Sequence, residues 1–444
     1  MHYDIAIVGG GISGLSALHY CRKFHPSKKI VLLEKSSQCG GNIQTTFRDG
    51  FLWENGPRSF LAKEPAMAEL IEDLGLSSNL VEANAKSKKR YIIKNAKLEA
   101  VPMGPMQMFR SPLSNWAVLK ELKKEWSLRS VSAKGETVAE FARRRWGAEI
   151  ATTFIGPMVS GVFAGDAEKL EVEAAFPRLL ALEKEKGSVL KGALFGKKRK
   201  GPFEGVRSSR LLSFKNGMEE LPQSLIKVYG ENIKTDKSVS SINREGEDWV
   251  LATENAGVIE KVTAKSLLLS CPMDVISSLF DDTPELPSEV LAYPPLLVLH
   301  LGFEKIVHDY EGFGYLAPVP EGLSALGVLL NDHIFPGLAH VGSSMTIMAG
   351  GMRFAEMSKN EIAEWVEKLI FEQKKLLGIE ADVLVKEVCF YERSIPQYNR
   401  GTCAYWEKLQ NWAQVSGVSL CGNYLHGVGI NDCVRNAKEW ALSL

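Results

Sequence analysis

The chain has 444 residues, and its 53 Lys and Arg are balanced by 53 Asp and Glu. This length is enough for two or three domains with a large core. The balanced charge gives no reason to expect nucleic acid or acidic partners. Seven Cys without a CxxC pair indicate reduced thiols and argue against a disulfide framework.

The first predicted strand, Asp4 to Val8, leads through a glycine-rich turn into a helix. Gly9, Gly11 and Gly14 occupy the three glycine positions of a G-x-G-x-x-G motif. In such a motif the first glycine permits the tight turn, the second lets backbone approach a pyrophosphate, and the third lets the helix pack on the strand. The N-terminus of the helix then presents unpaired N–H groups to the pyrophosphate. The residues expected to hold a cofactor here are Gly9, Gly10, Gly11, Ile12, Ser13 and Gly14.

A second predicted strand, KKIVLLEK, ends at Glu34, 20 residues after Gly14. A carboxylate at this position would accept hydrogen bonds from the ribose hydroxyls of an adenosine. Strand, turn, helix, strand and acid in register therefore predict a bound dinucleotide, with a purely structural turn as the alternative. We also expect no secretory signal before the first strand, and no membrane-spanning helix.

The rest of the chain alternates between helical and strand-like patterns. Helical signals dominate from about residue 85 to 210, strand patterns return from Leu211, and a last strand and helix are predicted at Val418 to Cys421 and Asp432 to Leu442. This order predicts an α/β fold with a discontinuous Rossmann-like dinucleotide-binding domain, an α+β substrate domain and a helical insertion. The expected domains are 1–84 with 211–290 and 415–444, then 85–105 with 291–414, and finally 106–210.

Two segments have the composition of membrane-contacting surfaces. Met103, Met106, Met108, Phe109 and Trp116 lie close together in sequence. Such residues either pack in a core or, when exposed, form an apolar surface that docks on a membrane. The basic run from Lys197 to Lys200 is either a lipid or nucleic-acid patch or, as we expect, a solvated loop.

Several longer motifs resemble one enzyme family. They are the N-terminal GGGISGL with the later pair Gly40-Gly41, the segment ENGPRSF (54–60), and the segments 157–192, 311–321 and 421–437. Together they resemble the oxygen-dependent protoporphyrinogen oxidase family, which belongs to the flavin monoamine oxidase-like superfamily and includes coproporphyrinogen-oxidising relatives. The chain departs from the family pattern at Gln44, where Arg is frequent, and at Asn436-Ala437, where Ser-Gly is usual.

The resemblance implies a flavoprotein with non-covalent FAD that oxidises protoporphyrinogen IX to protoporphyrin IX in haem biosynthesis. Six electrons would pass to dioxygen, which gives hydrogen peroxide, with a quinone as the alternative acceptor. Oxidation of coproporphyrinogen III is the main alternative; a flavin amine oxidase, a carotenoid desaturase or a non-catalytic flavin scaffold is more distant. We expect a monomer or homodimer in the cytoplasm, with peripheral membrane contact, no nucleic-acid partner and no metal site. No catalytic acid or base is nominated.

The resemblance also implies further site residues. A C-terminal glycine-rich turn, Gly422 to Ile430, would aim a second helix N-terminus at the flavin. The remaining expected cofactor residues are Lys35, Asn42, Ile43, Gln44, Thr45, Gly56, Pro57, Arg58, Ser59, Val239, Tyr391, Asn423, Val428, Gly429 and Ile430. For Tyr391, a purely structural role as an aromatic residue half-buried in a strand is an equally good interpretation.

Five residues are expected to meet the substrate. Arg58 would grip a propionate through two parallel hydrogen bonds, with a structural salt bridge as the alternative. Alternating small and aromatic residues would form one wall of the substrate pocket, or else pack in a core. These wall residues are Gly312, Phe313, Gly314 and Tyr315.

Overall fold

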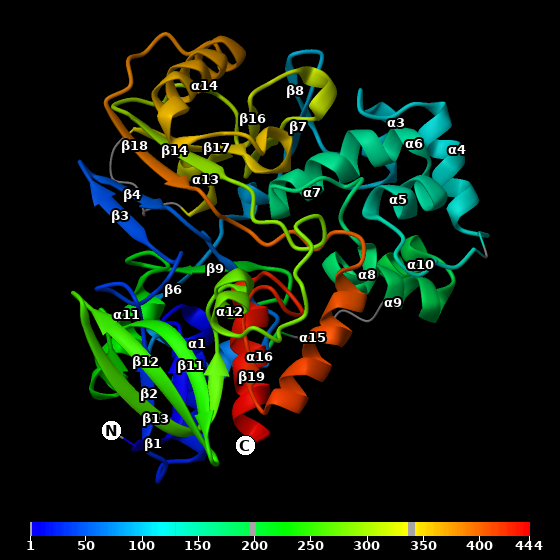
Figure 1. Cartoon of the computed structure of the whole chain (residues 1–444). Helices are drawn as coiled ribbons and strands as arrows, with labels where there is room; N and C mark the ends of the chain where they lie inside the picture. The colour runs from blue at the N-terminus through cyan, green and yellow to red at the C-terminus, as the bar shows by residue number, and fades with distance from the viewer. Residues whose placement is uncertain (1, 129, 196–200, 336–341) are drawn as a thin grey trace.

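The computed structural model describes residues 2–128, 130–195, 201–335 and 342–444. The basic run Lys197 to Lys200 lies outside the described residues. Within them, two seven-stranded sheets dominate the fold, one in the lower part of Figure 1 and one in the upper part. A group of helices lies at the side of the upper sheet. This arrangement confirms the predicted α/β class.

The lower sheet has the strand order β10-β2-β1-β13-β12-β11, with β19 paired to β13. Its strands are β1 (His2–Val8), β2 (Ile30–Leu33), β10 (Ile233–Lys234), β11 (Ser238–Glu245), β12 (Asp248–Asn255), β13 (Val258–Leu269) and β19 (Ser419–Leu420). β10, β2, β1, β13 and β19 are parallel, whereas β11 and β12 extend the sheet as an antiparallel hairpin. The carboxyl ends of the parallel strands therefore meet at one edge of the sheet.

Helices cover both faces of the parallel strands, and this explains their continuous apolar sequences. All four residues of β2, IVLL, are buried, as is typical of strands that are covered on both faces. Helices α1 (Ile12–Phe24) and α16 (Ile430–Leu442) pack on one face together with α2 (Pro65–Asp73) and α11 (Glu220–Tyr229). Residues of α15 (Thr402–Ser416) and α12 (Met273–Leu279) belong to the core on the other face.

The upper sheet has the order β18-β14-β17-β16-β15-β7-β8. Its strands are β7 (Tyr91–Lys94), β8 (Lys97–Ala100), β14 (Leu296–Phe303), β15 (Gly314–Leu316), β16 (Ala325–Leu330), β17 (Ser343–Gly350) and β18 (Val385–Tyr391). Helix α14 (Ile362–Leu377) covers one face, and its Val366 and Leu369 share a core with β14. The opposite face contains the buried polar side chains of His300 and Thr346.

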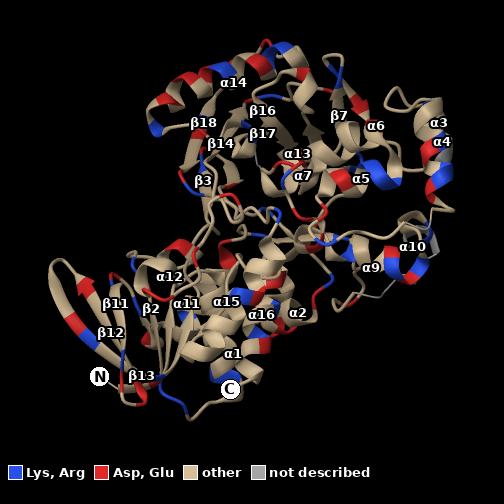
Figure 2. Cartoon of the chain, turned by 45° about the vertical axis from the view of Figure 1, so that its right-hand side comes forward, with Lys and Arg blue, Asp and Glu red and all other residues tan. Residues whose placement is uncertain are grey.

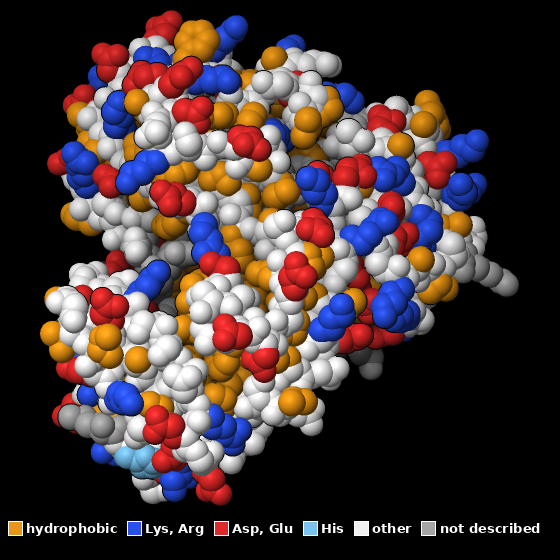
Figure 3. All heavy atoms as spheres, in the orientation of Figure 1, with side chains coloured by type: hydrophobic (Ala, Val, Ile, Leu, Met, Phe, Trp, Pro, Cys, Tyr) orange, Lys and Arg blue, Asp and Glu red, His pale blue; other side chains and the backbone are white. Residues whose placement is uncertain are grey.

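Short strands and helices connect the two sheets. Strands β3 (Thr45–Arg48) and β4 (Phe51–Glu54) form a hairpin, while β5 (Phe60–Leu61), β9 (Leu211–Phe214) and β6 (Leu80–Glu82) form a three-stranded sheet. The short helix α13 (Asn331–Ile334) follows β16. Single helical turns occur at several other points along the chain: η1 (Ser77–Asn79), η2 (Ala85–Lys88), η4 (Gly230–Asn232), η5 (Val319–Glu321), η6 (Gly351–Phe354) and η7 (Lys359–Glu361). Figure 3 shows apolar side chains exposed along the junction between the two parts of the molecule.

The segment between β8 and β9 is helical in the described residues. It contains α3 (Pro105–Arg110), α4 (Trp116–Glu125), α5 (Val138–Trp146), α6 (Ala148–Ile150), η3 (Ala151–Ile155), α7 (Gly156–Phe163), α8 (Val172–Ala175), α9 (Pro177–Lys186) and α10 (Val189–Phe195). Figure 2 shows Lys and Arg interspersed with Asp and Glu over surface helices such as α14, consistent with the balanced net charge. Among the described residues, no helix is both long enough and apolar enough to span a bilayer.

Candidate active site

The N-terminal glycines differ in what surrounds them. A Cβ atom on Gly14 would lie 2.0 Å from the carbonyl oxygen of Gly9 and 2.6 Å from Oγ of Ser270. Only glycine therefore allows α1 to lie so close to the strands. A Cβ on Gly11 would meet no atom within 4 Å, so this turn has open space on the side where a pyrophosphate would approach the backbone.

Glu34 is held beside this turn at the end of β2. The backbone N–H of Gly10 donates to its Oε2 at 2.6 Å, and the N–H of Ser36 donates to its Oε1 at 2.8 Å. Lys35 is exposed. The N–H of Lys237 bonds to the carbonyl oxygen of Glu34 at 2.9 Å, and this contact places Val239, two residues later on β11, near the same strand end.

Helices α1 and α16 run side by side in the same direction. At their C-terminal ends, Nε2 of His25 lies 2.9 Å from the carbonyl oxygen of Ala441. At their N-terminal ends, the hydroxyl of Ser13 forms hydrogen bonds with Cys433 and with Cys421. Neither helix has a side-chain cap on its first turn. Two sets of unpaired N–H groups thus lie together at the carboxyl edge of the sheet, where they favour an anionic ligand.

The loop before α16 is held by side chains from other elements. The hydroxyl of Tyr398 bonds to the carbonyl oxygen of Asn423 and accepts the N–H of Gly427 at 3.2 Å. Trp406 Nε1 donates to the carbonyl oxygen of Tyr424 at 2.8 Å. Val428 and Gly429 are half-buried, whereas the Ile430 side chain is buried in the core, so its backbone N–H is the part that faces the turn.

Asn436 explains one departure from the family pattern. Its Nδ2 donates to the carbonyl oxygen of Leu425 at 3.1 Å. The side chain that replaces the usual Ser therefore supports the loop from within α16.

The second glycine pair lies against the first turn. The N–H of Gly40 donates to the carbonyl oxygen of Gly10 at 2.8 Å, and Gly40 forms an isolated bridge with Gly11. Among the residues that follow, Ile43 is buried, whereas Asn42 and Gln44 are exposed and Gln44 Nε2 bonds to the carbonyl oxygen of Gly41 at 3.1 Å. This loop therefore brings exposed amide side chains next to the open space at Gly11.

Glu54 is a buried carboxylate that links several expected site residues. The Thr45 hydroxyl and the N–H of Met218 each donate to it at 2.8 Å. Burial raises its pKa to about 7, partly offset by these hydrogen bonds and by the charge of Arg58. Two residues further, a Cβ on Gly56 would lie 1.7 Å from the carbonyl oxygen of Asn42, so this segment and the Gly40–Thr45 loop are in close contact.

Arg58 is half-buried, and its guanidinium forms no ion pair with any other residue that the structure describes. Its Nε has no hydrogen-bond partner, and its Cζ lies 6.0 Å from the centre of the Phe335 ring. Burial lowers the pKa of Arg58 to about 10, against the opposing charges of Glu54 and Asp332. Its neighbours Pro57 and Ser59 are half-buried. A cation with a buried, unpartnered donor fits an anionic ligand better than a structural salt bridge.

The four residues expected to form one wall do not lie on one face. Phe313 packs against Ile334 and Phe335. Tyr315 is buried on the opposite face, beneath α14, where its hydroxyl bonds to Gln373. The two glycines are required by packing, because a Cβ on Gly312 would lie 2.5 Å from the Lys89 carbonyl oxygen and one on Gly314 would lie 2.0 Å from that of Val328. The expected single wall is therefore not formed, and Tyr315 packs in a core.

Arg90 is a further candidate residue that the sequence did not single out. Arg90 is exposed as a residue, but its guanidinium carbon lies 5.1 Å from the centre of the Phe313 ring, and partial desolvation of the guanidinium lowers its pKa. In sequence it closes a run of cations, AKSKKR, in which no position stands out. Because β15 pairs with β7, the fold brings Arg90 and Phe313 together. Phe313 also packs against the apolar cluster that contains Phe335, the ring beside Arg58.

Tyr391 lies at the end of β18 and pairs with Leu296. Directly opposed residues of antiparallel strands share a face, so Tyr391 shares the face of His300, four residues further along β14. His300 stacks on Trp53, and burial lowers its pKa to about 3, with a contribution from the charge of Arg58. Tyr391 therefore belongs to the face of the upper sheet that looks toward Arg58.

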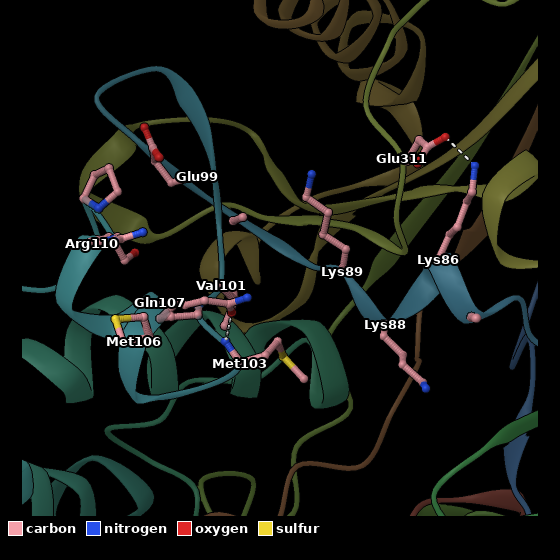
Figure 4. Close-up of a pocket in the computed structure, with 15 residues that line it drawn as sticks. Lys86, Lys88, Lys89, Glu99, Val101, Met103, Met106, Gln107, Arg110 and Glu311 are labelled. Carbon is pink, nitrogen blue, oxygen red and sulfur yellow. Dashed lines mark hydrogen bonds and ion pairs between the residues drawn. The ribbon is translucent and has the colours of Figure 1, made fainter.

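The methionine-rich segment is exposed. The exposed fractions are 69% for Met103, 68% for Met106, 62% for Phe109 and 81% for Trp116. Beside it lies a pocket of about 610 Å³, lined by Met103 and Met106 and by the cations Lys86, Lys88, Lys89 and Arg110. Figure 4 shows these side chains around the pocket, with Lys86 paired to Glu311. None of the lining residues belongs to the glycine turns.

The sheet, the two helix N-termini and the glycine turns define a dinucleotide-binding enzyme of the Rossmann type. A family model described as flavin containing amine oxidoreductase matches residues 12–441. The chain therefore belongs to the flavin-containing amine oxidoreductase family and is an oxidoreductase with a flavin cofactor.

Curated relatives support the predicted resemblance. The chain is 30% identical to protoporphyrinogen oxidase 1, chloroplastic, of Arabidopsis thaliana, over 99% of this chain and 88% of the relative. It is 28% identical to protoporphyrinogen oxidase of Bos taurus, over 99% of this chain and 98% of the relative. The resemblance to the protoporphyrinogen oxidase family is confirmed.

Solved structures show the same fold. A provisionally named protoporphyrinogen oxidase of Exiguobacterium sp. 255-15 has a TM-score of 0.84 and 24% identity, over 99% of this chain and 98% of that chain. A putrescine oxidase has a TM-score of 0.70 and 14% identity, over 100% of this chain and 99% of that chain. These likenesses concern the fold alone.

Proposed function

We propose that this chain oxidises protoporphyrinogen IX to protoporphyrin IX in haem biosynthesis, with non-covalent FAD as cofactor and dioxygen as electron acceptor. The observation that carries the substrate assignment is the guanidinium of Arg58, whose buried Nε has no hydrogen-bond partner, close to the segment that packs on the Gly40–Thr45 loop. A porphyrinogen is a large apolar ring with carboxylate side chains. It therefore needs an apolar pocket that contains a cation.

The residues present fit FAD. The open space at Gly11 and the uncapped N-termini of α1 and α16 suit a pyrophosphate and a reduced, anionic ring. Glu34 would accept hydrogen bonds from the ribose hydroxyls. When bound, FAD would accept two electrons at a time in three steps and pass them to dioxygen, which becomes hydrogen peroxide.

The protein groups act by binding and positioning. Arg58 would hold one propionate through charge-assisted hydrogen bonds. Arg90, stacked on Phe313, would hold a second carboxylate and keep that ring against the macrocycle. Glu54, held by Thr45 and Met218, keeps the Gly56–Arg58 segment in place. Electron release from the pyrroles already weakens the bridging C–H bonds, so the main contribution of the protein is orientation.

The cationic pocket in Figure 4 favours coproporphyrinogen III as a second candidate substrate. Lys86, Lys88, Lys89 and Arg110 line this pocket. Lys89 directly precedes Arg90 in the chain. Coproporphyrinogen carries propionates where protoporphyrinogen carries vinyl groups. Additional cations near the substrate site would match the additional carboxylates.

One pair of measurements tests these assignments. Under anaerobic conditions, addition of protoporphyrinogen should bleach the bound flavin, and readmission of air should restore its absorbance and release peroxide. Porphyrin fluorescence in steady-state assays with both porphyrinogens then gives the two kcat/KM values. Failure of both substrates to bleach the flavin would overturn the proposal, and a higher kcat/KM for coproporphyrinogen would replace the first substrate by the second.

We also propose that the exposed apolar segment from Met103 to Trp116 docks on a membrane. Exposed apolar side chains provide the insertion energy, and Arg110 and the lysines of the neighbouring pocket favour anionic lipid headgroups. The division into three domains, the cytoplasmic location and the choice between monomer and homodimer stay predictions.

A further inference from the structure

Three ligand-type side chains meet beside the candidate active site. His308 lies in the loop between β14 and β15, and Asp332 and His333 lie in α13. One potential ligand atom from each lies within 4.8 Å of the others. We propose that these three residues form a binding site for a divalent transition-metal ion, with Zn²⁺ as its representative. The sequence gives no hint of this site, because His308 stands 24 positions before Asp332 without a ligand-spacing motif.

The geometry suits such an ion. Oδ2 of Asp332 lies 3.4 Å from Nε2 of His333, close to the separation of about 3.4 Å between two ligands on a tetrahedral zinc ion. The His308 and His333 rings are 5.8 Å apart and inclined by 49°, so they are not stacked and each can turn a nitrogen toward a common point. Any further closure around an ion would need only a rotation of the His308 side chain, because all three ligand atoms already lie within 4.8 Å of one another.

His308 is the observation that separates a metal site from an ordinary ion pair. Its side chain is only 7% exposed, and neither ring nitrogen has a hydrogen-bond partner in the part of the chain that the structure describes. A buried imidazole without partners is costly, and a metal ion would satisfy one nitrogen. The backbone of Tyr310 lies near His308. Its carbonyl could therefore accept the N–H of the other nitrogen, as carbonyls commonly do for metal-bound histidines.

The electrostatic surroundings are mixed but permit a cation. Asp332 places a negative charge beside the His308 imidazole. Asp332 also accepts the N–H of Ser344 at 3.5 Å through Oδ1, which leaves Oδ2 for an ion. The positive charge of Arg58 disfavours a metal ion at this site. The negative charges of Asp309 and Glu311 favour one.

The ligand set selects the class of ion. Two imidazoles and one carboxylate suit zinc and related transition metals, whereas Ca²⁺ and Mg²⁺ prefer oxygen ligands alone. Three protein ligands also leave a fourth position for water or an anionic group. Another cluster, Glu171, Glu173 and Cys403, is a weaker candidate. Its Glu171 already accepts the N–H groups of Gly401 and Cys403, and burial raises the Cys403 thiol pKa to about 12.

Metal binding to the purified flavoprotein tests the proposal. After treatment with a chelator, calorimetric titration with ZnCl₂ should give one site per chain. His308→Ala and His333→Gln should each weaken this binding by at least tenfold, and added Zn²⁺ should raise the melting temperature of the wild type but not of either variant. Co²⁺ should give visible absorption bands beyond those of the flavin, without the near-ultraviolet charge-transfer band of a thiolate ligand.

Control variants make each outcome decisive. His2→Gln removes an exposed histidine, and Cys403→Ser disrupts the competing cluster; neither should change the zinc affinity. His333 is partly exposed, so His333→Gln should keep its flavin and its melting temperature without metal, even if His308→Ala is unstable. Wild-type zinc affinity in His333→Gln, or loss of binding in Cys403→Ser alone, would overturn the proposal.

Discussion

Gly14 lies so close to Gly9 that a Cβ on Gly14 would stand 2.0 Å from the Gly9 carbonyl oxygen. This contact determines how near the first helix approaches the first strand, and thus where its N-terminal N–H groups point. A side chain at Gly14 must therefore push the helix away from the strand, in a core where the neighbouring Leu15 is fully buried.

We predict that Gly14→Val abolishes flavin binding, because the helix N-terminus moves away from the pyrophosphate position. Gly11→Ala provides the contrast, since its Cβ would enter open space and should weaken flavin binding without disturbing the fold. The measurement is the flavin-to-protein absorbance ratio after purification, together with the thermal unfolding profile. A fully flavin-loaded Gly14→Val protein would show that this turn does not bind the cofactor.

The flavin should be released when the protein is denatured. Backbone N–H groups and the Glu34 carboxylate provide reversible contacts only. After precipitation with acid or heat, all the flavin should be found in the supernatant as FAD, measured by chromatography and fluorescence. Flavin that stays with the precipitated chain would mean a covalent link and would contradict this prediction.

Arg58→Ala should raise KM and lower kcat/KM for the porphyrinogen while the flavin content is retained. Loss of a hydrogen-bonded charge costs about 1.5–3 kcal/mol, or roughly tenfold to 150-fold in kcat/KM. Arg58→Lys should recover part of the loss, since it keeps the charge but not the planar fork. Steady-state kinetics on flavin-loaded protein measure the effect; loss of flavin with normal turnover after reconstitution would make Arg58 a cofactor or structural residue.

Glu54 should make the stability of the protein depend on pH. Its folded-state pKa is raised from 4.5 to about 7, so the native protein binds a proton that the unfolded chain has already lost. The stabilisation is fully present below about pH 4.5 and is lost as the pH rises through about 7. The loss is roughly 3 kcal/mol at most.

The Glu54→Gln variant, which cannot ionise, lacks this dependence. Urea unfolding at about pH 5 and pH 8 should therefore show the wild type losing stability relative to the variant as the pH rises. Glu260→Gln is the control, because the hydrogen bond from Lys237 lowers the pKa of Glu260. Glu260 is therefore ionised in both the folded and the unfolded protein between about pH 5 and pH 8, and its replacement should not change the pH dependence in this range. A constant difference between wild type and Glu54→Gln would show that Glu54 is already ionised at the lower pH.

Replacement of Met106, Met108 and Phe109 by Ser should abolish flotation with liposomes that contain anionic lipid. Met106 and Phe109 are 68% and 62% exposed, so the triple variant should keep its fold and its flavin. A matched control replaces Val228, Val258 and Ile259, which are also exposed but lie on the lower sheet and its helix. If the first variant unfolds, or if both variants float like the wild type, the docking surface is wrongly assigned.

The local sequence predicts the elements whose pattern is continuous along the chain. The motif around Gly9 predicts β1 and α1, and the buried run before Glu34 predicts β2. The apolar spacing near the C-terminus predicts α16, which begins at Ile430, two residues before the expected start. These elements depend on turn geometry and on burial of a continuous segment, which neighbouring residues themselves encode.

Residue pairing across the fold was decided by the tertiary structure. Phe313 and Tyr315 are two positions apart and would share a face in a regular strand. Gly312 and Gly314 flank Phe313, and both have positive φ, so the chain departs from regular strand geometry here. As a result, Phe313 meets Arg90, whereas Tyr315 meets Gln373. The environment of each side chain is set by the pairing of β15 with β7 and β16. The sequence pattern around residue 313 does not specify this pairing.

The sequence by itself determined the dinucleotide turn, the family and the presence of cations suited to carboxylates. Only the tertiary structure decided that the Nε of Arg58 is buried without a partner, that Glu54 is buried near it, and that His308 meets Asp332 and His333. Turn chemistry acts between residues a few positions apart. Burial and electrostatic coupling depend on distances in space, which are set by how β14, β16 and the β4–β5 segment pack together.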